Sequence, residues 1–276
     1  MMRRIFTLTG YLLRSLTLSL SGLLFVLLTL AYWRVFFDPT QRTPEVAYYI
    51  LLVGLFGAAL TFLVTLTVCS RANQAVNYPL LARLPSRVEY LTAVFLAAIL
   101  FATLLQLLLA LLATWRGPAL SPGRVLEMPP IWLSANVLAA VLSLHATDLV
   151  TKGWSRVVVY SVLAVLLFVQ NANQTMMDWL AGRVNNLSAW FFTQNINALG
   201  NAFNTMASWL AGQGLSAISR VVGIIFWPFH AIADATIAGA FTPAQALAPG
   251  ILLLYATVLF MLAADLFATK NLFLTE

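Results

Sequence analysis

Residues 70–100 read SRANQAVNYPLLARLPSRVEYLTAVFLAAIL, a short basic segment that runs directly into a long apolar one. Pro79 can occupy the first turn of a short amphipathic helix. Pro85 ends that helix, because the residue before a proline is disfavoured in the α conformation. Ser86 and Glu89 have the spacing of a capping box, which predicts that a new helix begins there. The stretch therefore predicts a polar surface helix that leads into a capped transmembrane helix.

The composition of the whole chain is that of an integral membrane protein. Of its 276 residues, 61% are hydrophobic and 9% are charged, whereas about a quarter of the residues of an ordinary soluble domain are charged. The net charge of +6 comes from basic residues scattered between apolar runs, which form no stripe that could follow a phosphate backbone. We therefore expect no nucleic-acid partner, and we interpret the basic residues as topology signals and contacts to lipid headgroups.

Apolar runs predict six transmembrane helices, because about 20 apolar residues are needed to cross the hydrocarbon core. The six runs are residues 16–33, 47–69, 90–115, 131–147, 157–170 and 250–267. The fifth is short and must extend into the polar residues beyond it to cross completely. Thr242 and Gln245 again have the spacing of a capping box, ahead of the last run. We expect an all-α integral membrane protein with one transmembrane domain over residues 1–276.

The remaining segments connect these runs. Residues 1–15 have polar and apolar side chains on opposite helical faces, which is typical of a helix in the cytoplasmic interface. Residues 70–89 are the predicted cytoplasmic segment, and residues 116–130 hold too many prolines and glycines for a continuous helix. Residues 171–249 are asparagine-rich and predict an outer segment of short helices. Within it, residues 221–229 include a Trp-Pro pair and predict a re-entrant half-helix.

The basic residues also indicate an orientation. With the N-terminus in the cytoplasm, the inner segments hold more of the 15 basic residues than the longer outer segments do. Cytoplasmic loops are enriched in Lys and Arg. An even number of spans then predicts that both termini lie in the cytoplasm.

Residues 80–91, LLARLPSRVEYL, resemble the permease subunit of ABC-2 type transporters. In that family the loop between the second and third spans has a coupling helix. A leucine pair, a proline, a hydroxyl or small residue with arginine, and a glutamate-led third span follow. The end of the chain is also similar, with Pro228 and Phe229 followed by residues 231–240 and the last span, after which residues 267–272 stand where many members have a basic tail. The resemblance covers the whole six-span layout.

The resemblance implies a transport subunit rather than an enzyme. The chain has no G-x-x-x-x-G-K-[ST] loop, so ATP and Mg²⁺ are expected on a separate ABC ATP-binding subunit, and no cofactor is expected here. The other implied partners are a second permease copy or a homologous permease, and membrane lipids, in the bacterial inner membrane. The implied contacts to the ATPase subunit are Asn73, Gln74, Leu80, Leu81, Arg83, Arg87 and Glu89.

A non-transporting membrane scaffold or a cofactor-binding subunit of a larger membrane complex is the main alternative. His145 and His230 are the two histidines that could ligate a haem or a chlorin. Hydrogen bonding within the bundle is the commoner role for such residues.

A secondary transporter is the third interpretation, and it ordinarily needs an ionisable residue inside the membrane. Asp148 and Asp265 lie near the ends of predicted spans instead. Asn136, Ser143 and His145 give the fourth span a polar side. That side either lines a pathway or packs against another helix.

Overall fold

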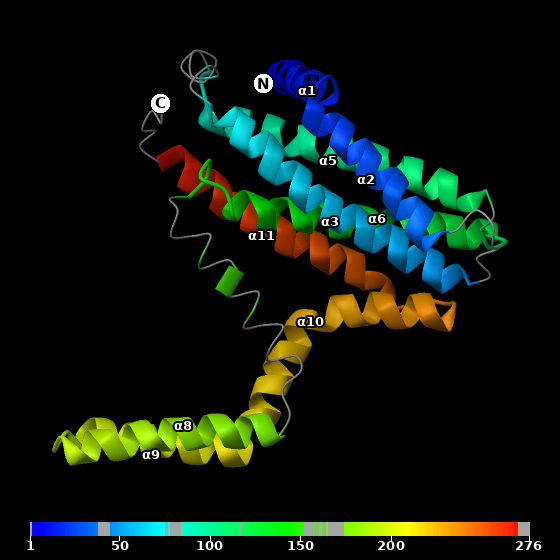
Figure 1. The fold of residues 1–276 in the computed structure, drawn as a ribbon. Coiled ribbons are helices and arrows are strands. Elements are labelled where there is room, and N and C mark those ends of the chain that lie inside the picture. The colour runs from blue at the N-terminus through cyan, green and yellow to red at the C-terminus, as the bar shows by residue number, and fades with distance from the viewer. Residues whose placement is uncertain are drawn as a thin grey trace. The chain divides into compact units, whose positions relative to one another are not determined.

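The computed structural model describes residues 2–37, 45–74, 77, 84–115, 117–151, 157, 160–161, 164 and 174–269 (Figure 1). Over these residues the chain is helical and contains no strand. It divides into two compact units: Met1–Val159 with Pro228–Glu276, and Tyr160–Trp227. The predicted all-helical class is confirmed for the described residues.

The first unit is a bundle of long apolar helices (Figure 1). α3 (Val46–Ala72) packs against α5 (Arg87–Thr114) and α6 (Pro122–His145), and α11 (Ala248–Thr269) packs against α5 and α6. The buried side of α3 repeats every three or four residues, at Val53, Gly57, Leu60 and Val64 among others. This spacing places one apolar stripe against the neighbouring helices.

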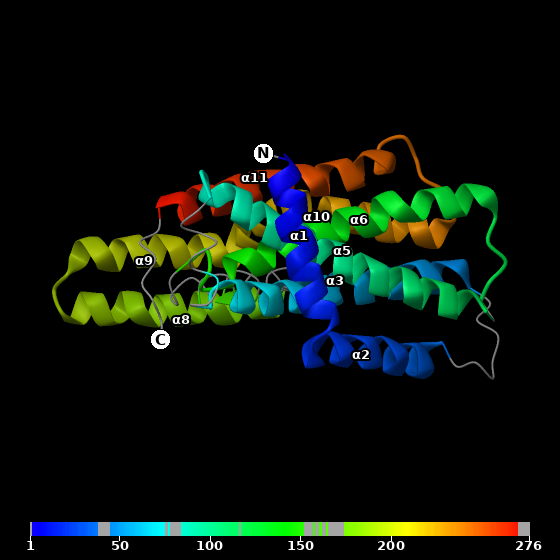
Figure 2. The same ribbon diagram turned by 90° about the horizontal axis from the view of Figure 1, so that it is seen from above.

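α1 (Met2–Thr17) and α2 (Leu20–Phe36) form a bent pair with an angle of 71° between them. Ser19 is the N-cap of α2, because its hydroxyl oxygen accepts a hydrogen bond of 3.2 Å from the Gly22 amide. α1 lies across α5 (Figure 2) and buries Ile5, Leu12 and Leu16. The sequence correctly predicts α1 as a separate amphipathic helix, and its position in the membrane interface stays a prediction.

Four described helices are long and apolar enough to cross a membrane. They are Val46–Ala72, Arg87–Thr114, Pro122–His145 and Gln245–Thr269. The bent pair α1 and α2 gives a fifth candidate if it is one span. Most of the predicted span at 157–170 lies outside the described residues. The structure is therefore compatible with a multi-pass membrane protein of four or five spans, and the sixth span stays a prediction.

As predicted, residues 116–130 do not form one continuous helix, because the described residues 117–121 are not helical, but the helix that follows starts nine residues before the predicted span at 131–147. α6 begins at Pro122, with Ser121 as its N-cap, and it continues through Pro129 and Pro130. Pro122 is in the first turn, where a missing N–H costs nothing. Pro129 and Pro130 lie early in the helix, and the surrounding first turns are largely exposed, so other groups can satisfy the carbonyls they leave unbonded.

The second unit is a helical hairpin. α8 (Gln174–Thr193) and α9 (Asn197–Trp209) pack together through small residues: Ala181, Ser188, Gly200 and Ala207. The Ser188 hydroxyl donates a hydrogen bond of 2.7 Å to the Gly200 carbonyl, which locks the register of the pair. Residues 171–249 contain helices, as the sequence predicts, but α8 has 20 residues and is not a short helix, and the outer position of this segment stays a prediction.

α10 (Leu215–Ala238) follows the hairpin after a π-helical turn at Leu210–Gly214. It runs through Pro228, where the boundary between the two units falls. Residues 221–229 therefore belong to a longer helix, and the predicted half-helix is wrong in its bounds.

The second predicted capping box is confirmed. The Gln245 amide lies 3.3 Å from the Thr242 hydroxyl, and the Gln245 side-chain oxygen accepts from the Thr242 amide at 3.0 Å. A short 3-10 turn at Gln245–Leu247 then leads into α11. These two hydrogen bonds satisfy backbone N–H groups that the start of a helix leaves unbonded.

Candidate functional site where α1, α3 and α5 meet

The residues predicted to contact an ATPase subunit fall at one end of the bundle. Asn73 and Gln74 follow the end of α3, and Arg87 and Glu89 lie in the first turn of α5. The remaining predicted contacts lie outside the described residues: Leu80, Leu81 and Arg83. The coupling helix itself therefore stays a prediction, and the two helix ends that it connects are described.

The predicted capping box at the start of α5 is only half formed. The Ser86 hydroxyl oxygen accepts a hydrogen bond of 3.3 Å from the Val88 amide, as an N-cap should. The Glu89 side chain does not return to Ser86 in the described part of the chain. It is 5% exposed, and its Oε2 atom has no hydrogen-bond partner there. The carboxyl group is turned into the packed side of α5 instead of back along the helix start.

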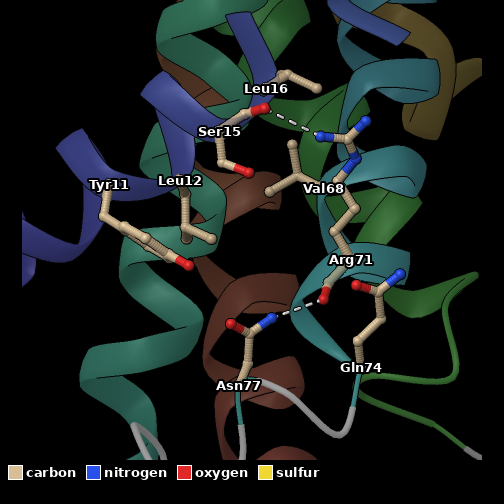
Figure 3. Close-up of a pocket in the computed structure, with 8 residues that line it drawn as sticks. All are labelled: Tyr11, Leu12, Ser15, Leu16, Val68, Arg71, Gln74 and Asn77. Atoms are coloured by element: carbon tan, nitrogen blue, oxygen red, sulfur yellow. Dashed lines mark hydrogen bonds between the residues drawn. The ribbon is translucent and has the colours of Figure 1, made fainter. Parts of the chain in front are cut away.

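Arg71, in the last turn of α3, joins this helix to the bend between α1 and α2. Its guanidinium donates to the Ser15 carbonyl at 3.1 Å and to the Ser21 hydroxyl at 3.0 Å. Figure 3 shows the side chain reaching Ser15. Ser15 is in the last turn of α1, whose carbonyls have no partner within the helix. Arg71 therefore caps α1 from another helix and fixes both sides of the bend.

Two further hydrogen bonds order the end of α3. The Asn77 side-chain amide donates to the Arg71 carbonyl at 2.8 Å (Figure 3). The buried Tyr90 hydroxyl, from the first turn of α5, donates to the Ala72 carbonyl at 2.9 Å. Through these contacts the end of α3 is held to α1, to α5 and to the segment that follows α3.

A cavity of about 270 Å³ lies beneath Arg71 (Figure 3). Residues of α1, the last turns of α3 and the segment after it line the cavity, with Tyr11, Ser15, Gln74 and Asn77 as its neutral polar groups. Its described lining contains no carboxylate. The cavity offers hydrogen-bond donors at a joint between three helices, and it pairs no nucleophile with a base.

A second polar group lies inside the bundle, away from this end. Gln106 of α5 donates to the Val53 carbonyl of α3 at 3.1 Å, and its oxygen accepts from the Asn136 amide of α6 at 2.6 Å. Both side chains are buried. A Cβ atom at Gly57 would overlap the Gln106 amide, so the glycine makes room for it. Gln106 thus connects three helices.

The other two polar residues predicted on α6 also bond to neighbouring helices. The Ser143 hydroxyl donates to the Phe62 carbonyl of α3 at 2.8 Å. The His145 Nε2 atom lies 2.9 Å from the Leu259 carbonyl of α11. The structure therefore places Asn136, Ser143 and His145 in contacts between helices, and none of them lines the cavity beneath Arg71.

The sequence did not single out Arg71 and Gln106 as functional residues, although each makes two side-chain hydrogen bonds to other helices or to the bend between them. Gln106 is a lone amide within the charge-free run of residues 90–115. A polar residue in such a run usually bonds across helices, so this signal was available. Arg71 had no comparable signal, because its partners lie 50 and 56 residues away in the chain.

Among the residues that the structure describes, no group of three or more His, Cys, Asp or Glu residues gathers in a way that could hold a metal ion. Cofactor ligation by His145 or His230 stays a prediction, and the described Nε2 contact of His145 is to a backbone carbonyl.

The chain has no match among family models, curated proteins or solved structures.

Proposed function

We propose that this chain is the permease subunit of an ABC-2 type exporter. One observation carries the proposal: the N-terminal amphipathic helix, the end of α3 and the start of α5 are joined at one end of an apolar bundle. This is the end at which the sequence resemblance expects a nucleotide-binding subunit to dock. In the proposal, that end faces the cytoplasm of a bacterial cell, with both termini on the same side.

The proposed mechanism is alternating access in a dimer of permeases. Separate ATP-binding subunits hold ATP and Mg²⁺, and their closure moves the segment between α3 and α5. Arg71 and Tyr90 connect the two ends of this segment to neighbouring helices through side-chain hydrogen bonds. A displacement of the segment would therefore reach α1, α2 and α5 together rather than α3 alone.

The proposal predicts that a reading frame beside this gene encodes an ATP-binding protein with a G-x-x-x-x-G-K-[ST] loop, and the test uses that protein. The two proteins are co-expressed and purified, and ATP hydrolysis is measured with and without the permease in lipid vesicles. Replacing both Arg83→Glu and Arg87→Glu is expected to abolish the stimulation of hydrolysis, because the changes reverse the charge of the docking segment. Arg183→Glu, on α8, is the matched charge reversal and is expected to leave stimulation intact. Unchanged stimulation in the Arg83 and Arg87 variant overturns the assigned docking site.

One observation favours a second candidate, a membrane scaffold that does not transport. The polar side of α6 is used for contacts between helices, at Asn136, Ser143 and His145. A scaffold needs only such a stable bundle. Its cofactor-binding form is tested by the absorption spectrum of the purified protein, in which a bound tetrapyrrole gives a Soret band.

A further inference from the structure

A second hollow lies along the first turns of α1, nearer its N-terminus than the Arg71 cavity, with a different set of lining residues. It has a volume of about 410 Å³, and its described lining is Arg3, Arg4, Thr7, Leu8 and Leu84. Leu84 comes just before the Ser86 cap of α5. The hollow therefore lies between the first turns of α1 and the chain that enters α5.

The charged groups of this hollow are two guanidinium groups. Both Arg3 and Arg4 are exposed, and neither has an acidic partner among the residues that the structure describes. The Thr7 hydroxyl donates to the Arg3 carbonyl at 2.8 Å, so it is already used within the helix. Guanidinium groups present several donors in a plane and match the oxygens of a phosphate group. The hollow is thus suited to an anion of that chemistry.

The other walls of the hollow are apolar. Leu8 and Leu84 are half-buried and face a space that the arginines border. Next to them on α1, Met2 is 76% exposed and Phe6 is 64% exposed. A helix with basic side chains beside exposed apolar ones binds at the boundary between headgroups and acyl chains. A free phosphate ion would leave these apolar groups in water, whereas a phospholipid would cover them.

We propose that the hollow between α1 and Leu84 binds the headgroup of an anionic phospholipid, with Arg3 and Arg4 on its phosphate and Leu8 and Leu84 against its glycerol and acyl region. The bound lipid joins α1 to the chain that enters α5. The proposal requires that the protein lies in a membrane, and it does not depend on a transport function.

The test uses the full-length protein purified in a neutral detergent. Native mass spectrometry compares the retention of dioleoyl phosphatidylglycerol, of dioleoyl phosphatidylcholine and of soluble glycerol phosphate. Selective retention of phosphatidylglycerol is expected. Because a basic residue near an anionic surface contributes a roughly fivefold effect on binding, Arg3→Gln with Arg4→Gln is expected to weaken retention by about 25-fold. Arg4→Gln alone is expected to weaken it by about fivefold, which decides the matter if the double variant does not fold.

Arg14→Gln is the matched control, because it removes the same charge from the same helix outside the hollow. Its lipid retention should equal that of the unchanged protein. An equal loss in Arg14→Gln would mean diffuse attraction to the whole helix and would overturn the site. Equal retention of phosphatidylcholine, or displacement of the lipid by an equal concentration of glycerol phosphate, would overturn the assignment to an anionic phospholipid.

Discussion

Gln106 shows how one side chain can organise an apolar bundle. Its amide reaches a carbonyl of α3 and its oxygen accepts from Asn136 of α6. A buried polar group that loses its partner costs more than the hydrogen bond contributed, because water cannot replace the partner. Pairs of this kind therefore fix the rotation of each helix about its own axis, which apolar packing alone leaves loosely defined.

We expect Gln106→Leu to destabilise the protein by about 1–3 kcal/mol, because Asn136 would then keep a buried amide without an acceptor. Adding Asn136→Leu should recover part of the loss, since both polar groups are then replaced by apolar ones. Thermal unfolding of the three variants in detergent measures the coupling. Simple additivity of the two changes would contradict a direct interaction.

Arg71 has a different role, because it is attached to the bend between α1 and α2. We expect Arg71→Ala to speed amide hydrogen exchange in residues 15–22 and to cost about 1 kcal/mol, from lost hydrogen bonds of a charged donor at a partly exposed position. Arg71→Lys should be intermediate, because an ammonium group lacks the planar fork that reaches both Ser15 and Ser21.

The control for this prediction is Arg14→Ala, which removes an exposed arginine from the last turn of α1. Its exchange pattern in the bend should match that of the unchanged protein. If both variants loosen the bend equally, the effect comes from the charge of α1 and not from the bond made by Arg71.

The ends of the helices are set by local chemistry. Ser19, Ser86 and Ser121 each accept a hydrogen bond from an amide of the helix that follows. Thr242 does the same ahead of α11, with Gln245 completing the pair. The start of a helix can therefore be predicted from a Ser or Thr just before it and the residues of its first turn. A proline in the first turn, such as Pro122 after Ser121, is compatible with such a start.

We expect Thr242→Ala to destabilise the start of α11 by about 1 kcal/mol, the usual cost of removing a threonine N-cap. Amide hydrogen exchange at residues 243–248 should rise in this variant. Thr257→Ala removes a hydroxyl that bonds only within α11, to the Leu253 carbonyl, and serves as the control. Equal effects of the two changes would show that the cap contributes nothing specific.

The number of membrane crossings depends on the bent pair of α1 and α2 and on the predicted span at 157–170. Four helices qualify alone and the bent pair adds a fifth, while the predicted span at 157–170 lies mostly beyond the described part. Six crossings place the start of α6 and the hairpin of α8 and α9 on the same side. Five crossings, without the span at 157–170, place them on opposite sides.

Cysteine labelling can distinguish these arrangements. Cys69 is fully buried, so Cys69→Ala provides a silent background. A side chain at Gly10, Gly123 or Gly182 would meet no neighbouring atom within 4 Å, which makes these positions suited to single cysteines. We expect an impermeant maleimide to label positions 123 and 182 in intact cells, and position 10 only after permeabilisation. Labelling of 123 without 182 would contradict the span at 157–170.

The sequence by itself determined the helical class, four of the long apolar helices, the amphipathic helix at the N-terminus and the Thr242 cap. These features depend on the spacing of apolar residues and on contacts within a few positions of the chain. The full extent of α6 escaped this reasoning, because the prolines at 129 and 130 are tolerated only through the exposed position of the first turns.

Only the tertiary structure decided which polar groups meet. Arg71 bonds to residues 15 and 21, Gln106 to residues 53 and 136, and His145 to residue 259. Such pairs depend on which helices are neighbours and on how each is rotated and shifted along its axis. An apolar run of uniform hydrophobicity does not encode these quantities, because lipid-facing and helix-facing positions are both apolar. The packed bundle selects the rotation in which these three side chains meet their partners.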